Sequence, residues 1–312
     1  MDFSAAGSQK LLILKGRLNQ SINSDKYPYL KINNKICKSN NTKMAEGRRY
    51  LFSSEQVNSG HPDKLCDYVS DSILDAALEL DPNARVAVET CAKNNGISII
   101  GEISCQGDLN FEKIIRKAAR EIGYDSVEKG LNYANCQVII NIDYQSAEIM
   151  KAVGEVKEEN IGAGDQGIMF GYATDEDESY LPMSYVMATR LLQKYDECRR
   201  NGTLTWARPD AKSQVTLEYE ETEKGLKVLS VHTIVMSVQH GPEVTQEQLK
   251  KDLQEHVISK VLPEHLKGDH IIYFLNPSGS FIMGGPTGDA GLTGRKIIAD
   301  TYGGWGSHGG IF

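Results

Sequence analysis

Residues 85–105 read RVAVETCAKNNGISIIGEISC, and this stretch is the clearest structural signal in the chain. It holds two runs rich in β-branched residues, at 85–92 and 97–105, on either side of an Asn-Asn-Gly sequence at 94–96. Asn and Gly tolerate the positive φ angles that tight turns need. The stretch therefore predicts a β-hairpin.

Helical patterns lie on both sides of this hairpin. Residues 62–80 carry apolar side chains at helical spacing, with a proline at the favoured first position. Residues 110–122 are amphipathic and end near Gly123, as helices often do. A further strand is predicted at 136–144, so that the order is helix, hairpin, helix and strand.

The same order of elements returns in the second half of the chain. The pattern predicts a helix, a hairpin around Lys224-Gly225, a helix that Pro263 ends, and a strand. The expected ranges are 183–200, 215–219, 226–238, 243–261 and 270–275, and a short helix at 293–302 begins a third unit. The expected fold class is α/β (α+β), with repeated domains in which helices cover sheets.

Composition and charge exclude some classes of protein. The chain has 312 residues, of which 40% are hydrophobic and 24% charged, as is usual for a globular protein of two or three domains. Its net charge of −8 argues against nucleic acid as the main partner, but not against nucleotides. Because no apolar run approaches the roughly 20 residues of a transmembrane helix, no membrane insertion is expected.

The first segment differs from the rest in charge. Residues 1–43 hold eight Lys or Arg and two acidic residues, hence a net charge of +6. The segment lacks sustained periodicity, and it favours Lys over the Arg that is typical of transit peptides. We interpret residues 1–48 as a basic, disordered extension, with Met44 as a candidate start of the folded protein.

The cysteines indicate a cellular compartment rather than a metal site. There are six, without a C-x-x-C pair or an accompanying His cluster, so zinc is not expected. Several lie in apolar runs, as Cys136 does before Gln-Val-Ile-Ile. They fit buried free thiols in a reducing compartment, and we expect a cytoplasmic protein.

Three segments carry side chains suited to phosphate chemistry, although each also has a plain structural interpretation. Residues 60–64 (Gly-His-Pro-Asp-Lys) open a helix, where His and Asp could contact phosphate and Mg²⁺ or simply cap the helix. Residues 208–214 (Arg-Pro-Asp-Ala-Lys-Ser-Gln) offer an acid and a cation, or a solvated turn. Residues 291–296 (Gly-Leu-Thr-Gly-Arg-Lys) place two cations beside glycines, which suits polyphosphate, or form a charged surface face.

Two other patterns are weaker. The G-x-G-x-x-G spacing at 162–167 does not follow a strand of a βαβ unit, and Asp165 would repel pyrophosphate, so a dinucleotide site is rejected. Glu89 and Glu102 lie within the predicted hairpin. Charged residues in strands usually face solvent, and if buried they need a cation or a hydrogen-bond donor.

Together these segments resemble methionine adenosyltransferases (S-adenosylmethionine synthetases). The similarity covers about residues 49–310 and rests on strings that occur in the family's order, at 60–64, 162–173, 208–214 and 284–304. The resemblance implies three α/β domains around a pseudo-threefold axis, and a homodimer or tetramer whose active sites are shared between subunits. The implied boundaries are 49–147, a mobile loop at 148–160, 161–279, and the start of a third domain at 280–312.

The resemblance also implies a reaction and its cofactors. Methionine sulfur attacks C5′ of ATP and displaces triphosphate, which the enzyme then hydrolyses to phosphate and pyrophosphate. A pair of Mg²⁺ ions in each site and K⁺ would assist. A thioether nucleophile needs no base, which agrees with the lack of a nucleophile and base pair in the sequence.

Residue roles follow from the same resemblance. The residues implied as catalytic are His61, Lys212, Arg295 and Lys296. These four are also expected to contact ATP, together with Asp210, Ser278, Gly279, Phe281 (stacked on adenine) and Asp289. Those expected at methionine are Glu102, Gln145, Asp165 and Asp289, and those expected at metals are Glu55 and Asp63 for Mg²⁺ and Glu89 for K⁺.

Three departures from the family's pattern bear on activity. The loop that begins at Gln145 differs from the usual Gln-Ser-Pro-Asp-Ile, and Ser280 stands where Arg is usual. The family also continues past the His-Gly-Gly segment into a stretch with further phosphate-binding Lys and a metal-binding Asp. We therefore expect a truncated third domain. The alternative is a non-catalytic relative or fragment that binds nucleotide or pairs with a full-length subunit.

Overall fold

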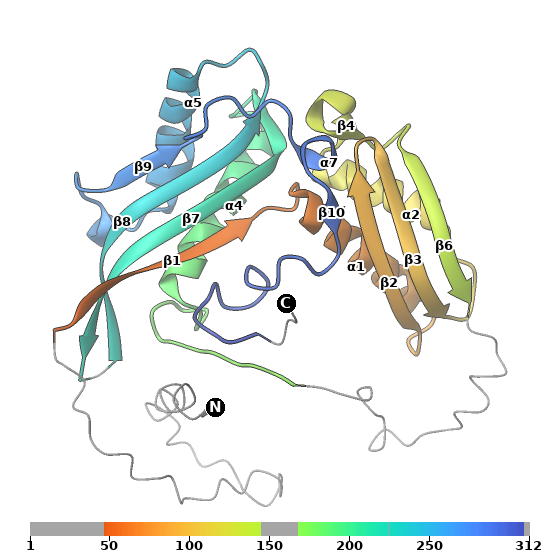
Figure 1. Ribbon diagram of the computed structural model, residues 1–312, viewed down its shortest axis with the longest axis horizontal. Coiled ribbons are helices and arrows are strands. Elements are labelled where there is room, and N and C mark those ends of the chain that lie inside the picture. The colour runs from red at the N-terminus through yellow and green to blue at the C-terminus, as the bar shows by residue number, and fades with distance from the viewer. Residues whose placement is uncertain (1–46, 145–167, 224, 309–312) are drawn as a thin grey trace, which may run out of the picture.

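The computed structural model describes residues 47–144, 168–223 and 225–308, and its first four-stranded sheet is built on the predicted hairpin (Figure 1). Strand β2 (Arg85–Lys93) pairs antiparallel with β3 (Gly96–Ser104), and β3 pairs in parallel with β6 (Gln137–Tyr144). Asn94 in the turn has a φ of 51°, the left-handed conformation that Asn tolerates. The hairpin and the following strand are confirmed.

The second four-stranded sheet repeats this arrangement with a longer hairpin and a shorter parallel strand. Strand β7 (Ala207–Thr222) pairs antiparallel with β8 (Gly225–His240), and β8 pairs in parallel with β9 (Ile272–Leu275). The predicted hairpin is confirmed, but both strands extend well beyond 215–219 and 226–238. The residues at the ends of these strands, such as those of the 208–214 string, are largely polar. They lack the apolar alternation from which strands are predicted.

Each sheet takes its fourth strand from a distant part of the chain. Strand β1 (Arg49–Val57) pairs antiparallel with β7 and so joins the second sheet. The two-residue strand β10 (Gly291–Leu292) pairs with β2 and joins the first sheet. These two crossings bring three segments to the space between the sheets: the connection from β1 to α1, the start of β7, and the segment around β10 (Figure 1).

Helices cover one face of each sheet (Figure 1). On the first sheet, α1 (Pro62–Leu80) and α2 (Phe111–Ile122) pack their apolar stripes into one buried cluster with β2 and β3. On the second, α4 (Met183–Arg200) packs into another cluster with β7 and β8. The predicted helices at 62–80, 110–122 and 183–200 are thereby confirmed.

The helical run near 243–261 begins later than expected. It comprises α5 (Gln246–Asp252), the π-helical turn η4 (Leu253–Ile258) and α6 (Ser259–Val261). Thr245 caps the first turn by accepting a hydrogen bond from the Gln248 amide at 3.2 Å. The elements that the sequence did not predict are the nine-residue strand β1 and a set of short ones: β4 (Asp125–Ser126), η2 (Val127–Lys129), β5 (Leu131–Asn132), η5 (Glu264–Leu266), α7 (Gly285–Gly288) and β10.

The predicted helix at 293–302 is wrong, because this segment forms a series of turns. The amide of Thr293 donates to Thr90 O at 3.0 Å, and the amide of Gly294 donates to Asp67 Oδ1 at 2.8 Å. These bonds direct the first backbone donors to α1 and β2 rather than to a helical ladder.

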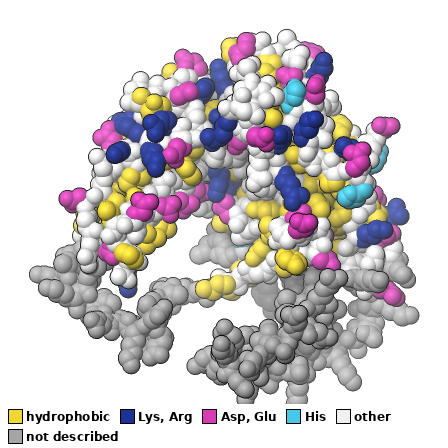
Figure 2. All heavy atoms as spheres, turned by 180° about the vertical axis from the view of Figure 1, so that it is seen from behind, with side chains coloured by type: hydrophobic (Ala, Val, Ile, Leu, Met, Phe, Trp, Pro, Cys, Tyr) yellow, Lys and Arg dark blue, Asp and Glu magenta, His cyan; other side chains and the backbone are white. Residues whose placement is uncertain are grey.

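Three further properties complete the description. None of the helices among the described residues is long and apolar enough to cross a membrane. The cysteines in the described ranges, Cys66, Cys91, Cys105, Cys136 and Cys198, are free. Seen from behind, acidic and basic side chains are interspersed over the surface (Figure 2).

Candidate active site

The N-terminus of α1 forms one wall of the site. His61 is the N-cap residue, and its Nδ1 accepts a hydrogen bond from the Asp63 amide at 3.1 Å. Because Nδ1 is the acceptor, the neutral imidazole carries its proton on Nε2. His61 thus caps the helix, as the plain interpretation predicts, and still presents one N–H donor.

The start of α1 is fastened to the beginning of β7. Asn58 Nδ2 donates to Pro209 O at 2.7 Å, and Asn58 Oδ1 accepts from the Ala211 amide at 3.0 Å. A Cβ on Gly60 would lie 2.0 Å from Pro209 O, so the two backbones approach as only glycine allows. This contact places the 208–214 string, with Lys212 opposite Val57, beside His61.

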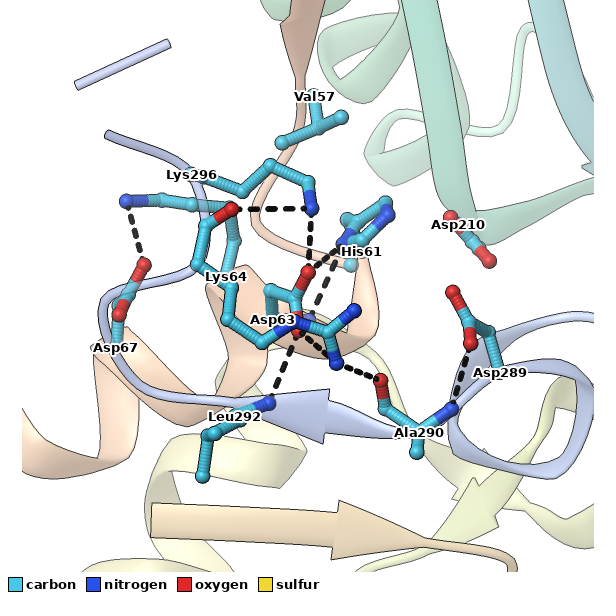
Figure 3. Close-up of polar contacts among 12 residues, drawn as sticks. Val57, His61, Asp63, Lys64, Asp67, Asp210, Asp289, Ala290, Leu292 and Lys296 are labelled. Atoms are coloured by element: carbon cyan, nitrogen blue, oxygen red, sulfur yellow. Dashed lines mark hydrogen bonds and ion pairs between the residues drawn. The ribbon is translucent and has the colours of Figure 1, made fainter. Parts of the chain in front are cut away.

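Asp63 is the centre of the charged cluster (Figure 3). Its fully buried carboxylate accepts a hydrogen bond from the Leu292 amide at 2.9 Å and another from Lys296 Nζ, and Arg295 Nη1 lies 3.6 Å away. Burial alone would raise the pKa of Asp63, but the hydrogen bonds from Lys296 and Leu292 hold it below its usual value. The carboxylate therefore stays ionised and fixes two cations beside the helix.

His61 is kept neutral by its surroundings. Burial lowers the pKa of its imidazole, and the positive charges of Lys296 and Lys212 lower it further, to about 4. The carboxylates of Asp63 and Asp289 act in the opposite direction and do not compensate. At neutral pH the site thus combines positive charge on lysines with a neutral hydrogen-bond donor.

The pKa of Asp210 is shifted in the opposite direction, upward. Its Oδ2 accepts from the Gly285 amide at 2.9 Å, whereas its buried Oδ1 has no protein partner. Burial raises the pKa of this carboxyl to about 6, against the lowering effects of the Gly285 amide and Lys212. The side chain faces Asp289 across the site (Figure 3), and that carboxylate also raises the pKa of Asp210.

These two groups predict opposing effects of pH on the stability of the ligand-free protein. The pKa of folded His61 is lowered from 6.5 to about 4, so only the unfolded chain binds this proton between those values and stability falls as pH decreases. The pKa of folded Asp210 is raised from 3.8 to about 6, so its contribution to stability falls as pH increases through that range. Each amounts to roughly 3 kcal/mol.

The measurement is the free energy of unfolding by urea from about pH 4 to about pH 7. Asp210→Asn should make stability rise more steeply with pH than in the unaltered chain, and His61→Gln should make it rise less steeply or fall. Parallel curves for all three proteins would contradict the assigned perturbations.

The residues expected at adenine lie at the end of the second sheet. Ser278 is exposed in the turn after β9, and Gly279, with a φ of 86°, donates its amide to Asn276 O at 2.9 Å. Phe281 is half-buried and continues toward α7. The segment from Phe281 to Gly285 therefore connects this end of the sheet to the charged cluster.

Other predicted residues lie outside this cluster or outside the described ranges. Glu55 is exposed on β1 opposite Gln214, and Glu89 and Glu102 are exposed on neighbouring strands of the first sheet. Within the described ranges, no group of three His, Cys, Asp or Glu side chains is arranged to hold a metal. Gln145 and Asp165 lie outside the described residues.

The structure also indicates residues that were not singled out from the sequence. Lys64 Nζ contacts Asp300 Oδ1 at 2.8 Å and Asp67 Oδ2 at 3.0 Å, and so ties α1 to the 293–302 segment. Arg208 Nη1 donates to Glu128 O at 2.6 Å and to Ile282 O at 3.0 Å. Both residues lie within quoted motifs, but nothing in a motif reveals a partner far away in the sequence.

This geometry defines an α/β protein with a cationic site, formed where three chain segments meet between two sheets. Comparison with models of known protein families identifies the family to which this chain belongs. The N-terminal, central and C-terminal domain models of S-adenosylmethionine synthetase match residues 49–147, 160–281 and 283–311. The chain belongs to the S-adenosylmethionine synthetase family, whose members are metal-dependent methionine adenosyltransferases that use ATP and methionine.

Proposed function

We propose that this chain forms S-adenosylmethionine by direct attack of the methionine sulfur on C5′ of ATP. The S–C5′ bond forms as the C5′–O bond breaks, and the electron pair leaves with triphosphate. Water then splits triphosphate into phosphate and pyrophosphate. The observation that supports this proposal best is the group of cations, Lys212, Arg295 and Lys296, around the neutral His61 at a helix N-terminus.

The cations suit the leaving group. Triphosphate carries up to five negative charges once the C5′–O bond has broken, so positive charge placed in advance lowers the barrier to its departure. Lys212 and Lys296 both lie close enough to His61 to lower its pKa. The Nε2–H of His61 can donate a hydrogen bond to the oxygen that leaves C5′, without adding a charge that methionine's ammonium group would repel.

Substrate positions follow from the arrangement of the loops. Adenine would stack on Phe281, with Ser278 and Gly279 in the same loop. Asp210, with its unpartnered buried Oδ1, offers an acceptor to a hydroxyl of the sugar. Asp289 would contact both methionine and nucleotide, and Glu102, Gln145 and Asp165 complete the proposed methionine contacts.

The metal proposals differ in how well the described residues fit them. Mg²⁺ often takes one or two carboxylates and fills its other positions with water and substrate phosphates. Asp63 fits that pattern, because it is an ionised carboxylate beside the proposed phosphate site. Asp63 would hold Mg²⁺, which supplies further positive charge to the phosphate oxygens. Glu55, exposed on β1 outside the charged cluster, is proposed as a further Mg²⁺ position, and Glu89 would hold K⁺.

A homodimer or tetramer with shared active sites is proposed from the open faces of the sheets. The face of the first sheet opposite α1 and α2 exposes Ile100, Ile139 and Leu292. The corresponding face of the second sheet exposes Leu51, Ile272 and Phe274. Apolar side chains gathered on a flat sheet face are typical of subunit interfaces. The free cysteines support a cytoplasmic location.

The test is product formation by the purified chain with ATP, methionine, Mg²⁺ and K⁺. We expect S-adenosylmethionine, phosphate and pyrophosphate in equal amounts, measured by mass spectrometry and phosphate assays. Removal of Mg²⁺ with EDTA should abolish formation of all three, and its return should restore them. A chain that binds ATP but forms no product would instead support a nucleotide-binding or regulatory role.

A further inference from the structure

The buried His240, at the end of β8, holds the backbone of Phe281 at two points. The His240 amide donates to Phe281 O at 3.1 Å, and the Phe281 amide donates to His240 Nε2 at 3.0 Å. One residue thus satisfies both backbone groups of Phe281, once through its main chain and once through its side chain.

The ring of His240 is itself fixed. Its Nδ1 lies 2.8 Å from Gly241 O, a contact that requires the proton on Nδ1. Its Nε2 is then free to accept from the Phe281 amide, and Gln246 Nε2 lies 3.3 Å from the same atom. Each ring nitrogen has a protein partner, so the tautomer and orientation of His240 are set.

Neighbouring contacts confine the Phe281 side chain as well. A Cβ on Gly284 would lie 2.9 Å from Phe281 Cε2, so the ring rests against bare backbone. The next carbonyl, Ile282 O, accepts from Gln239 Nε2 at 3.1 Å and from Arg208 Nη1 at 3.0 Å. The ends of β7 and β8 therefore hold residues 281 and 282 in place.

We infer that His240 is a positioning residue for the nucleotide base, because it sets the place of the aromatic ring on which the base stacks. The inference rests on the proposed function, in which Phe281 contacts adenine. Stacking depends on the position of a ring plane, and fixing that plane in the free protein removes an ordering cost from binding. Inorganic tripolyphosphate lacks a base, so its binding should not depend on His240.

The experiment compares two amide substitutions in the full chain, with Mg²⁺ present. The amide of His240→Asn can reach the position of Nδ1 and keep the Gly241 contact, but it is too short to replace Nε2. His240→Gln can bring an oxygen to the position of Nε2 and accept from Phe281. Calorimetry gives the Kd of each protein for ATP and for tripolyphosphate.

His240→Asn should raise the Kd for ATP about five- to tenfold, as expected for the loss of one hydrogen bond, and leave the Kd for tripolyphosphate within about twofold. His240→Gln should bind both ligands nearly as the unaltered chain does. If the Asn variant does not fold, Gln246→Met, which removes the second donor to Nε2, should weaken ATP binding alone by a smaller factor.

Two results would overturn the inference while leaving the proposed function intact. One is equal weakening of ATP and tripolyphosphate binding in His240→Asn, which would indicate a general structural role. The other is unchanged ATP binding in that variant. If Phe281→Ala binds ATP as tightly as the unaltered chain does, the adenine platform itself is wrong, and if the unaltered chain binds neither ligand, the proposed function fails with it.

Discussion

Lys212→Ala is expected to lower the rate of S-adenosylmethionine formation about a hundred- to a thousandfold, the loss typical when one preorganised charge-stabilising group is removed. The Lys212 side chain is exposed on β7 and forms no ion pair with any residue in the described part of the chain. Its positive charge nevertheless lowers the pKa of both His61 and Asp210. An unpaired cation in this position is available to a polyphosphate.

Once turnover by the unaltered protein has been measured, kcat and KM for both substrates are compared between it and the Lys212→Ala variant. Because Lys212 would act on the leaving group, the KM for methionine should change only a few-fold. Lys227→Ala is the matched control, since Lys227 is also exposed and lies near the opposite end of the same hairpin. A Lys212→Ala enzyme that retains a rate within a few-fold of the original would exclude the triphosphate role.

Gly60→Ala is expected to destabilise the folded chain by about 3 kcal/mol or more, the range of the severe core and backbone substitutions. The new Cβ would lie 2.0 Å from Pro209 O and 2.3 Å from Pro209 C, and both are backbone atoms. Asn58 fixes that backbone through its bonds to Pro209 O and the Ala211 amide. Relief would require separating α1 from β7.

Equilibrium unfolding in urea tests this expectation. Gly171→Ala provides the control, because a Cβ there meets nothing within 4 Å. It should change the free energy of unfolding by no more than about 0.5 kcal/mol. If Gly60→Ala were as mild as the control, the close approach of α1 and β7 would not exist in solution.

Local patterns predicted most of the elements correctly. The apolar stripe of α1 and the Asn-Asn-Gly turn between β2 and β3 depend on residues a few positions apart, so the sequence displays them directly. Strand β10 has only two residues, and its pairing with β2 depends on a partner far away in the chain. No short-range period reveals such a strand.

The structure brings several of the predicted site residues together, but their roles remain predictions and their contacts could not be predicted from the sequence. His61, Asp63 and Lys212 all lie in motifs that could be recognised. The bond from Lys296 to Asp63 joins residues 233 positions apart, and such pairings depend on the tertiary fold. The hypothesis that strand carboxylates usually face solvent agrees with the exposure of Glu89 and Glu102, whereas their roles in metal and methionine binding remain predictions.

The exchange of outer strands has a consequence for the order in which the protein folds during synthesis. The ribosome makes α1 early, yet the amide of Leu292, which binds the Asp63 carboxylate, lies 229 positions later. Strand β1 likewise cannot pair until β7 has been made, because Arg49 and its partner Glu220 are 171 positions apart. Contacts of such long range form late and slow the search for the native state.

A nascent chain can therefore assemble the hairpin of β2 and β3 on α1 and α2 well before its charged site exists. Until residues 291–296 emerge, the carboxylate of Asp63 lacks the partners that compensate its burial. We expect this part of the early chain to remain hydrated and loosely packed, and to need protection from aggregation. The cationic site would then be completed only after residues 291–296 have been made, so that shorter nascent chains hold no functional centre.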